Sequence, residues 1–446
     1  MRWARRLQAM ISRKKALFIA APLLALLALI FIAREAPFAV GPPLPEGKVA
    51  PRISNSALYL VAPDGSLWFW NLEAARSAKA GRREFTDTPQ RVGSDSDWLQ
   101  VESGMQTVGL KTDGSLWGWG PNDKGEAGQT KRSLRVFKPT RIGSDNDWKQ
   151  ISAGLGHSLA LKKDGSLWAW GWNYAGQVGN GTTQNRFGPV QIGLDHDWKE
   201  ITAGLGESFA LRQNGTLWAW GRDAETSGAT TRNNDILQPQ PLGNDTNWVS
   251  ISAGPGLFLL ALRGDGTIWI FGSDMEWCSP LIPDSIKPGA RVGRDSDWAE
   301  VRAGSRCLFA RKRDGSWWAG GQNTDGALGL GRFNTPQTSH ANAAFAPLQR
   351  LPFSFDPWAF ASGSGHTVLL ARDGNLWCWG ERLCAPEAPD LQQKWHAWCE
   401  RLRSKLPGRH PPSTWSPVPR DARPHVLWKL PPEVTRNLGE NRVEGR

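Results

Sequence analysis

Short runs of alternating apolar and polar residues recur along most of the chain, joined in pairs by an Asp-Gly or Asn-Gly dipeptide. In one copy, residues 158–163 and 166–170 flank Asp164-Gly165. The alternation is typical of β-strands, and an Asp-Gly pair between two such runs predicts a two-residue hairpin turn. The chain is therefore expected to be built from short antiparallel hairpins.

The expected hairpin register pairs Leu161 with Trp168 on one face and Ala160 with Ala169 on the other. Side chains alternate across a strand, so each hairpin gains one bulky aromatic face and one small face. A single hairpin cannot bury such a face alone. Stacking the bulky face of one unit on the small face of the next would bury both.

The same unit returns at a nearly constant interval of about 50 residues. A Trp opens each unit, and 19 of the 26 tryptophans occupy repeat positions, which favours packing over a ligand-binding aromatic cage. Such a period indicates a propeller or another repeat array. The hairpin dipeptides begin at Asp64, Asp113, Asp164, Asn214, Asp265, Asp314 and Asp373, and the opening tryptophans are Trp98, Trp148, Trp198, Trp248, Trp298 and Trp358.

The order of motifs within one repeat carries a family resemblance. Ile-Ser-Ala-Gly begins at Ile151, the hairpin follows, and Gly-Gln-Val-Gly comes at residues 176–179. This resembles the repeat of the regulator of chromosome condensation (RCC1-like) family in its bacterial form. The resemblance implies an all-β, seven-bladed β-propeller over residues 52–380. The Gly-Gln-x-Gly loop varies at 125–128 and 326–329, and is lost after Gly221 and Gly272.

The resemblance also suggests what such a protein does. The nuclear member of the family is a guanine-nucleotide exchange factor on chromatin, and bacterial relatives include a secreted propeller that inhibits β-lactamases. A nucleotide-exchange or regulatory role is therefore one alternative for this chain.

The N-terminal segment predicts a membrane anchor. Residues 1–15 carry six positive charges and no acidic residue, and residues 16–33 form an uninterrupted apolar run. Eighteen helical residues span about 27 Å, close to the hydrocarbon thickness of a bilayer. The charge bias predicts a cytoplasmic N-terminus, and residues 34–51 form a Pro-rich linker. We expect a single-pass protein of the bacterial inner membrane with a periplasmic or extracellular propeller. A cleavable signal peptide is the alternative.

The net charge of +11 does not predict nucleic-acid binding. The first 33 residues hold six of these charges and residues 400–446 another five, so the remainder is neutral. A neutral propeller lacks the basic face that phosphate binding requires.

No catalytic group, metal site or cofactor site is predicted. The recurring Asp-x-Asp before each opening Trp, as at Asp145 and Asp147, lacks the further ligands of a calcium loop and is interpreted as a turn cap. His157 and His366 occupy one blade position and are interpreted as hydrogen-bonded turn residues.

The C-terminal region departs from the repeat. Residues 381–415 contain apolar positions at helical spacing, which predicts a short helical insertion, and Cys384 and Cys399 bracket it as a disulfide candidate. Residues 416–430 resemble the segment before and including Trp198. They are expected to supply a ring-closing strand, with Trp428, to an incomplete first blade, and residues 431–446 form a tail.

Recognition is expected where the repeats diverge. The longest aromatic-bearing loop contains Trp172 and Tyr174 and runs to Arg186 and Phe187, and such side chains dominate interface energetics. The structural alternative is that these side chains cover the blade edge. The predicted function is a membrane-anchored, non-enzymatic scaffold that binds a protein or envelope ligand; the alternative from another class is an enzyme acting on envelope glycan or peptide.

Overall fold

Among the residues that it describes, the computed structural model contains 28 β-strands and no helix. Within those residues no helix is long and apolar enough to cross a membrane, and the predicted anchor at 16–33 lies outside them. The described residues are 52–53, 58–70, 90–222, 235–254, 256, 258–272, 289–323, 326–330, 345–351, 357–362, 366–371, 375–380 and 425–429.

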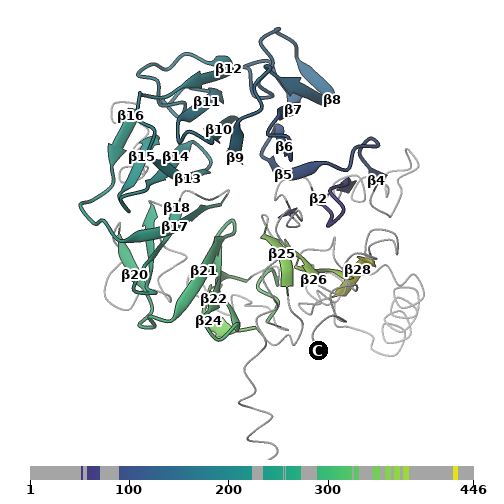
Figure 1. Cartoon of the computed structure of the whole chain (residues 1–446). Coiled ribbons are helices and arrows are strands. Elements are labelled where there is room, and N and C mark those ends of the chain that lie inside the picture. Colours follow the sequence, from purple (N-terminus) through teal and green to yellow (C-terminus); the bar gives the residue numbers. More distant parts are fainter. Residues whose placement is uncertain are drawn as a thin grey trace, which may run out of the picture. The chain divides into compact units, whose positions relative to one another are not determined.

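The strands form seven four-stranded antiparallel sheets, each in chain order, which are the blades (Figure 1). Blades one and two contain β1 (Arg52–Ile53), β2 (Leu58–Val61), β3 (Leu67–Trp70), β4 (Gln90–Arg91), β5 (Trp98–Ser103), β6 (Thr107–Lys111), β7 (Leu116–Pro121) and β8 (Arg135–Ile142). Blades three and four contain β9 (Trp148–Ala153), β10 (His157–Lys162), β11 (Leu167–Gly171), β12 (Arg186–Gln191), β13 (Trp198–Ala203), β14 (Glu207–Arg212), β15 (Leu217–Gly221) and β16 (Ile236–Pro241). Blades five to seven contain β17 (Trp248–Ala253), β18 (Phe258–Arg263), β19 (Ile268–Gly272), β20 (Ala290–Val292), β21 (Trp298–Ala303), β22 (Cys307–Lys312), β23 (Trp317–Gln322), β24 (Phe345–Arg350), β25 (Pro357–Ser362), β26 (His366–Ala371), β27 (Asn375–Gly380) and β28 (His425–Lys429).

The blades follow one another around a closed ring. The first strand of each of blades two to five contacts the first strand of the next blade. Cys307 Sγ on β22 lies 3.6 Å from Ser362 Oγ on β25, which joins blade six to blade seven. β1 contacts both β5 and β25, so the first and last blades meet. The expected all-β, seven-bladed propeller is confirmed.

The hairpin turns contain three residues rather than two. Leu161 pairs with Leu167, and Lys162 N–H donates to the carbonyl of Ser166 at 3.1 Å. Gly165 alone then needs the left-handed conformation, and its φ is +83°. The predicted turn is therefore one residue too short. The predicted pairing of Leu161 with Trp168 is wrong by one residue, because Trp168 pairs with Ala160.

The Asp side chain explains this choice of turn. The Asp164 carboxylate accepts hydrogen bonds from the Ser166 backbone N–H at 2.9 Å and from the Ser166 hydroxyl at 2.7 Å. The Ser166 oxygen in turn accepts from Trp168 Nε1 at 2.9 Å. An Asp that caps its own turn in this way stabilises a type I turn followed by Gly.

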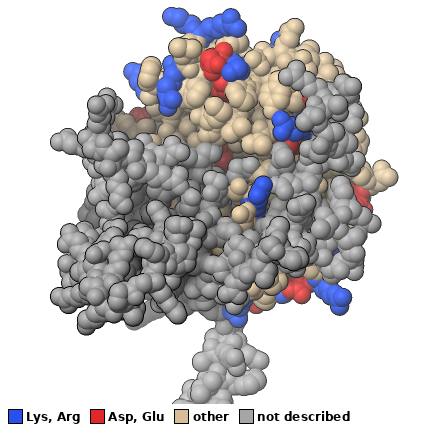
Figure 2. All heavy atoms as spheres, turned by 180° about the vertical axis from the view of Figure 1, so that it is seen from behind, with Lys and Arg blue, Asp and Glu red and all other residues tan. Residues whose placement is uncertain are grey.

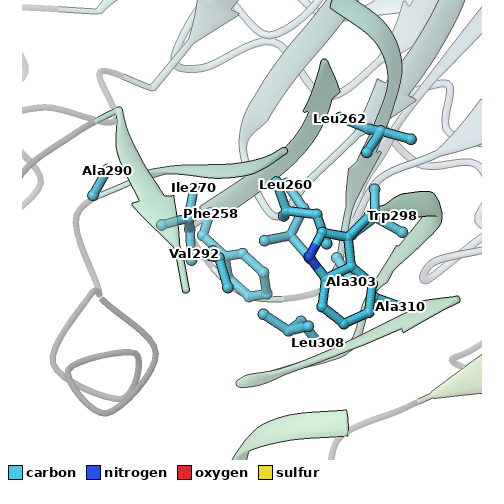
Figure 3. Packing of buried hydrophobic residues seen from close by; sticks show 12 residues of the cluster. Phe258, Leu260, Leu262, Ile270, Ala290, Val292, Trp298, Ala303, Leu308 and Ala310 are labelled. Carbon is cyan, nitrogen blue, oxygen red and sulfur yellow. The ribbon is translucent and has the colours of Figure 1, made fainter. Parts of the chain in front are cut away.

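The shifted register changes the composition of the blade faces. One face carries leucines, such as Leu159, Leu161 and Leu167, and it packs on Trp198 and Trp220 of the next blade. The expected small face is therefore wrong, because a shift of one residue reverses which side chains share a face. Figure 3 shows the same packing between blades five and six, where Leu260 of blade five lies beside Trp298 of blade six and Ile270 belongs to the same cluster.

Adjacent blades are also joined by an indole hydrogen bond. In blades three, four and seven, the second Trp of the Trp-x-Trp strand donates from Nε1 to a backbone carbonyl in the Gly-Gln-x-Gly-type loop of the preceding blade. The pairs are Trp170 with Glu126 at 3.2 Å, Trp220 with Gln177 at 3.0 Å and Trp379 with Ala327 at 2.8 Å. In blade two, Trp119 donates instead to the Tyr59 hydroxyl of blade one at 2.9 Å. Blades five and six follow blades whose sequences lack the Gly-Gln-x-Gly motif, and they carry Phe271 and Gly320 at the Trp position.

The Asp-x-Asp pairs hold a cation between two indoles. Lys162 Nζ lies 4.9 Å from the ring centroids of both Trp148 and Trp168, and 2.6 Å and 3.2 Å from carboxylate oxygens of Asp145 and Asp147. The Asp pairs thus serve as ion-pair partners, which their interpretation as turn caps did not include. The equivalent cations are Lys111, Arg212, Arg263 and Lys312.

The C-terminal strand is present but completes a different blade from the expected one. β28 pairs with β27, so it is the outer strand of blade seven. The predicted addition to blade one is wrong because β1 already occupies the inner position there, beside β2. The predicted helical insertion at 381–415, with Cys384 and Cys399, lies outside the described residues, as do the linker at 34–51 and the tail at 431–446.

Candidate partner-binding surface

The loops between the first and second strands and between the third and fourth strands of a blade lie at one end of the propeller, because antiparallel strands reverse direction at each connection. We call this end the loop end. The hairpin turns and the Asp-x-Asp segments lie at the opposite end, the turn end. Trp172 and Tyr174 follow β11 and so belong to the loop end.

A buried asparagine fixes the loop that carries these two aromatic residues. Asn173 Oδ1 accepts from the Val178 N–H at 2.8 Å, and Nδ2 donates to the carbonyls of Thr182 at 2.7 Å and Gln184 at 3.0 Å. The loop closes on one side chain and therefore holds Trp172 and Tyr174 in fixed positions on either side of it.

A row of two aromatic rings with a cation at each end crosses three blades at the loop end. Lys124 Nζ of blade two lies 4.7 Å from the ring centroid of Trp172, and the Trp172 and Tyr174 rings meet edge to face at 6.1 Å. Arg222 of blade four donates from Nη2 to the Tyr174 hydroxyl at 2.9 Å. We call Lys124, Trp172, Tyr174 and Arg222 the cross-blade row.

The row combines exposure with rigid support. Tyr174 is 44% exposed, whereas Trp172 is half-buried. A Cβ on Gly156 would lie 2.6 Å from Trp172 Cδ2, so the indole rests directly on that backbone. The Trp172 side chain thus covers the blade edge and also leaves part of its ring exposed. Covering of the edge and availability to a partner, the two alternatives for this residue, are therefore compatible.

Exposed apolar side chains continue from the row along the neighbouring loops. Leu155, next to Gly156, is 38% exposed, and Met105 in the corresponding loop of blade two is 46% exposed. The two loops are linked directly, because Met105 N–H donates to the Leu155 carbonyl at 2.9 Å.

Charge at the row is local and largely compensated. Lys124 forms an ion pair with Asp123 at 2.9 Å, which raises the pKa of Lys124 and lowers that of Asp123. Burial raises the pKa of Glu126 in the same loop, and its carboxylate accepts from Lys124 N–H at 2.9 Å. The row therefore offers aromatic and cationic contacts without a concentrated field.

The other two candidate residues lie apart from the row, on β12. Phe187 and Arg186 are half-buried, and Gly125 of blade two lies against their backbone. The Arg132 guanidinium stacks 5.1 Å from the Phe187 ring. These contacts assign both residues to the junction between blades two and three.

Two members of the row were missed by sequence reasoning. Arg222 stands directly after the Trp-x-Trp-Gly strand of blade four, at a position where the repeats differ, and this was the available signal. Lys124 had none, because only the fold brings the loop of blade two onto Trp172.

The comparisons with known proteins agree with this architecture. A family model described as the regulator of chromosome condensation (RCC1) repeat matches residues 113–161 and 164–211, and a second model of that description matches 148–177 and 359–381. The chain thus carries RCC1-type repeats on a seven-bladed propeller. The zebrafish (Danio rerio) protein RCC2 homolog is 36% identical over 101 residues, which cover 21% of this chain. That match spans only 20% of the length of the relative.

Solved structures share the fold. Human WBSCR16 superposes with a TM-score of 0.58 and 19% identity, over 74% of this chain and 88% of that one. Prp20p from Saccharomyces cerevisiae, studied with respect to its binding of Gsp1p and histones, gives a TM-score of 0.58 and 18% identity, over 78% and 85%. Yeast RCC1 (Prp20) bound to Kap60 gives 0.56 and 20%, over 67% and 74%.

The two ends of this RCC1-repeat propeller differ in character. The turn end repeats the same Trp–cation–Asp arrangement in blades two to six, except that Asn247 replaces one Asp, so its charges are paired in a regular way. The loop end differs from blade to blade, and the cross-blade row occurs only once in the part of the chain that the structure describes. The RCC1-repeat propeller thus presents its individual features at the loop end.

Proposed function

We propose that this protein is a non-enzymatic interaction propeller that binds a protein partner through its loop end, and that the cross-blade row is the centre of the contact. The observation that carries the proposal is the row itself. Four side chains from three blades are joined by one hydrogen bond and by ring contacts, with a partly exposed Tyr at the middle.

The physical argument rests on the cost of ordering side chains. Binding normally immobilises flexible side chains, and each one costs about 0.5–1.5 kcal/mol. Here Arg222 is held by Tyr174, and Trp172 rests on Gly156, so much of that cost is met in the free protein. Trp, Tyr and Arg are also the types that concentrate binding energy in interfaces.

A buried Ser–His contact does not favour the enzymatic alternative. His157 Nε2 lies 2.9 Å from Ser208 Oγ, but both side chains are fully buried, and the Ser208 hydroxyl donates to the Gln177 carbonyl at 2.7 Å. Burial lowers the pKa of His157 to about 4, so the ring is neutral at pH 7. Because the Ser208 hydroxyl proton is directed to Gln177, the Ser208 oxygen accepts from His157 Nε2–H. The nitrogen facing the hydroxyl therefore carries a proton already and is no base for it.

We further propose that the propeller is held at the outer face of a bacterial inner membrane by residues 16–33. The support is the apolar run preceded by six positive charges. In this arrangement the linker at residues 34–51 separates the propeller from the bilayer, and the partner is a protein or ligand of the cell envelope.

Site-specific photo-crosslinking tests the proposed interface. A benzophenone amino acid replaces Tyr174 in one variant of the full chain and Leu194, an exposed residue of the turn end, in the control. Irradiation in cells should give a discrete adduct from position 174 and none from position 194. Equal adducts from both positions, or none from position 174, would reject the loop end as the binding surface.

A further inference from the structure

The outer strand of blade two is unlike the other outer strands. β8 contains eight residues, more than β12, β16, β20 and β24, and it is the last strand of its sheet. Leu134 beside it is 84% exposed and Phe137 within it is 87% exposed. An exposed apolar edge strand is a template for another strand.

The same segment is strongly basic although the propeller as a whole is neutral. Five cations and no carboxylate lie between residues 130 and 142, namely Lys131, Arg132, Arg135, Lys138 and Arg141, and all five are exposed. Within residues 90–222 no carboxylate forms an ion pair with Lys131, Arg135 or Lys138. In Figure 2, Lys and Arg side chains gather at the upper edge of the described surface, at the height of β8 in Figure 1.

The backbone of this strand has hydrogen-bonding groups that point away from the sheet. The Leu134 carbonyl accepts from Asn122 N–H at 3.1 Å, on the side of β7. Val136 pairs with Gly120, two residues further along both strands, so the N–H and carbonyl of Val136 also face β7. Successive residues alternate, and the N–H and carbonyl of Arg135 and the N–H of Phe137 therefore face outward.

We propose that β8 binds an acidic, extended segment of a partner protein by strand addition. The outward groups of Arg135 and Phe137 would extend the sheet, Leu134 and Phe137 would contact apolar side chains of the partner, and Arg135 and Lys138 would pair with its carboxylates. A second copy of this chain is disfavoured as occupant, because two β8 strands would bring their cations together.

The geometry specifies a sequence pattern for the partner. The added strand runs antiparallel to β8, so its residues face positions 138 to 134 in that order. It needs acids opposite Lys138 and Arg135 and apolar residues opposite Phe137 and Leu134, while the residue between, opposite position 136, is free to vary. Glu-Val-Thr-Glu-Val fulfils this order, with its second Glu opposite Arg135. This surface uses none of the residues of the cross-blade row, so it does not depend on the function proposed for that row.

Fluorescence anisotropy with the full chain and a labelled peptide containing Glu-Val-Thr-Glu-Val tests the proposal. The peptide should bind at least about tenfold more tightly than its Lys-Val-Thr-Lys-Val counterpart. N-methylation of the second Glu removes the amide that faces Arg135 and should weaken binding by about tenfold, whereas N-methylation of the Thr, whose amide faces away, should have little effect.

Protein variants assign the binding to β8. Arg135→Glu with Lys138→Glu, and separately Leu134→Ser with Phe137→Ser, should each weaken peptide binding by about tenfold or more. Lys149→Glu and Leu194→Ser change an exposed cation and an exposed apolar residue elsewhere and should not. Trp172→Ala with Tyr174→Ala should also leave peptide binding unchanged, which separates this proposal from the loop-end function.

Three outcomes would overturn the proposal. The peptide does not bind, or both N-methylated peptides bind equally well, or the Leu134 and Phe137 variants retain affinity. Single-stranded DNA or phosphatidylglycerol vesicles that bind in a Lys138-dependent way while the peptide does not would identify the strand as a polyanion or membrane contact instead.

Discussion

The indole of Trp220 is hydrogen-bonded to the backbone of Gln177 in the preceding blade, with Nε1 donating to the carbonyl at 3.0 Å. The glycine that ends the same loop, Gly179, lies so close that an added Cβ would be 2.6 Å from that nitrogen. The Gly-Gln-x-Gly loop of one repeat and the Trp-x-Trp strand of the next are therefore two halves of a single contact. Where the sequence lacks the motif, after Gly221 and Gly272, the next blade carries no Trp at this position, and in blade two Trp119 is retained with the Tyr59 hydroxyl as its acceptor.

Substitution of Gly179 tests this contact. Gly179→Ala introduces both an unfavourable φ of +82° and a clash with a buried Trp, so it should lower the free energy of unfolding by about 2–4 kcal/mol. Gly143 has a φ of +65° and nothing within 4 Å of an added Cβ, and Gly143→Ala should cost only the backbone term of about 1 kcal/mol.

Urea unfolding monitored by Trp fluorescence measures both variants. Equal losses of stability would show that backbone strain alone matters and that the packing of Trp220 on the loop contributes nothing.

The sequence predicted the seven blades because their period and hairpin dipeptides are local signals. It did not predict the strand register, since the Asp164 carboxylate caps a three-residue turn and moves every cross-strand pair by one position. The cross-blade row was half predicted. Trp172 and Tyr174 stood out as divergent aromatic residues, whereas Lys124 reaches Trp172 from 48 positions away along the chain through tertiary contact alone.

The cation between two indoles is expected to stabilise each blade. Lys162→Met keeps the aliphatic stem but removes the charge that faces Trp148, Trp168, Asp145 and Asp147, and the two carboxylates are left close together. The free energy of unfolding should fall by about 1–2 kcal/mol.

The adjacent Lys163 provides the matched control. It is exposed, and its backbone N–H rather than its side chain bonds to Asp147. Lys163→Met should leave the midpoint of unfolding unchanged. A loss as large as that of Lys162→Met would mean that general charge, not the indole site, sets the effect.

His157 should make the protein acid-sensitive. Complete burial lowers its pKa to about 4, against about 6.5 in an unfolded chain. Between these values the unfolded state binds a proton that the folded state does not. Stability should therefore fall as the pH drops from about 6.5 to about 4, by up to about 3 kcal/mol, and level off below. His157→Gln should remove this slope in unfolding curves recorded across that range; an unchanged slope would contradict the assignment.

Glu207 should act in the opposite sense. Burial raises the pKa of its carboxyl, and Gly206 N–H bonds to one oxygen at 3.1 Å. The folded state therefore favours the protonated acid, and stability decreases as the pH rises from about 4.3 through the raised value. Glu207→Gln, which installs the residue found at Gln106 in blade two, should stabilise the protein at pH 7 but not at pH 4. Stabilisation of equal size at both values would point to packing instead of charge.

Fusions at the C-terminus test the membrane topology. Alkaline phosphatase, which is active only after export, should be active when fused after Arg446, and the full-length protein should sediment with membranes. Replacement of the basic residues among positions 1–15 by Ser or Gln should reduce both signals. Activity of a cytoplasmic reporter at Arg446 would reverse the orientation, and a mature N-terminus near residue 37 would show a cleaved signal peptide.

β28 should be needed for a soluble propeller. It pairs with β27 from His425 to Lys429 and is the outer strand of the blade that meets blade one. Removing it exposes the edge of β27, which carries Trp377 and Trp379, and an uncovered apolar edge favours aggregation. A chain that ends at residue 424 should therefore aggregate or melt several degrees lower than one that ends at residue 430. The chain that ends at residue 430 keeps β28 but lacks the residues after it. The comparison therefore separates the contribution of β28 from that of residues 431–446. Equal melting temperatures and equal solubility for the two chains would show that blade seven is stable with three strands.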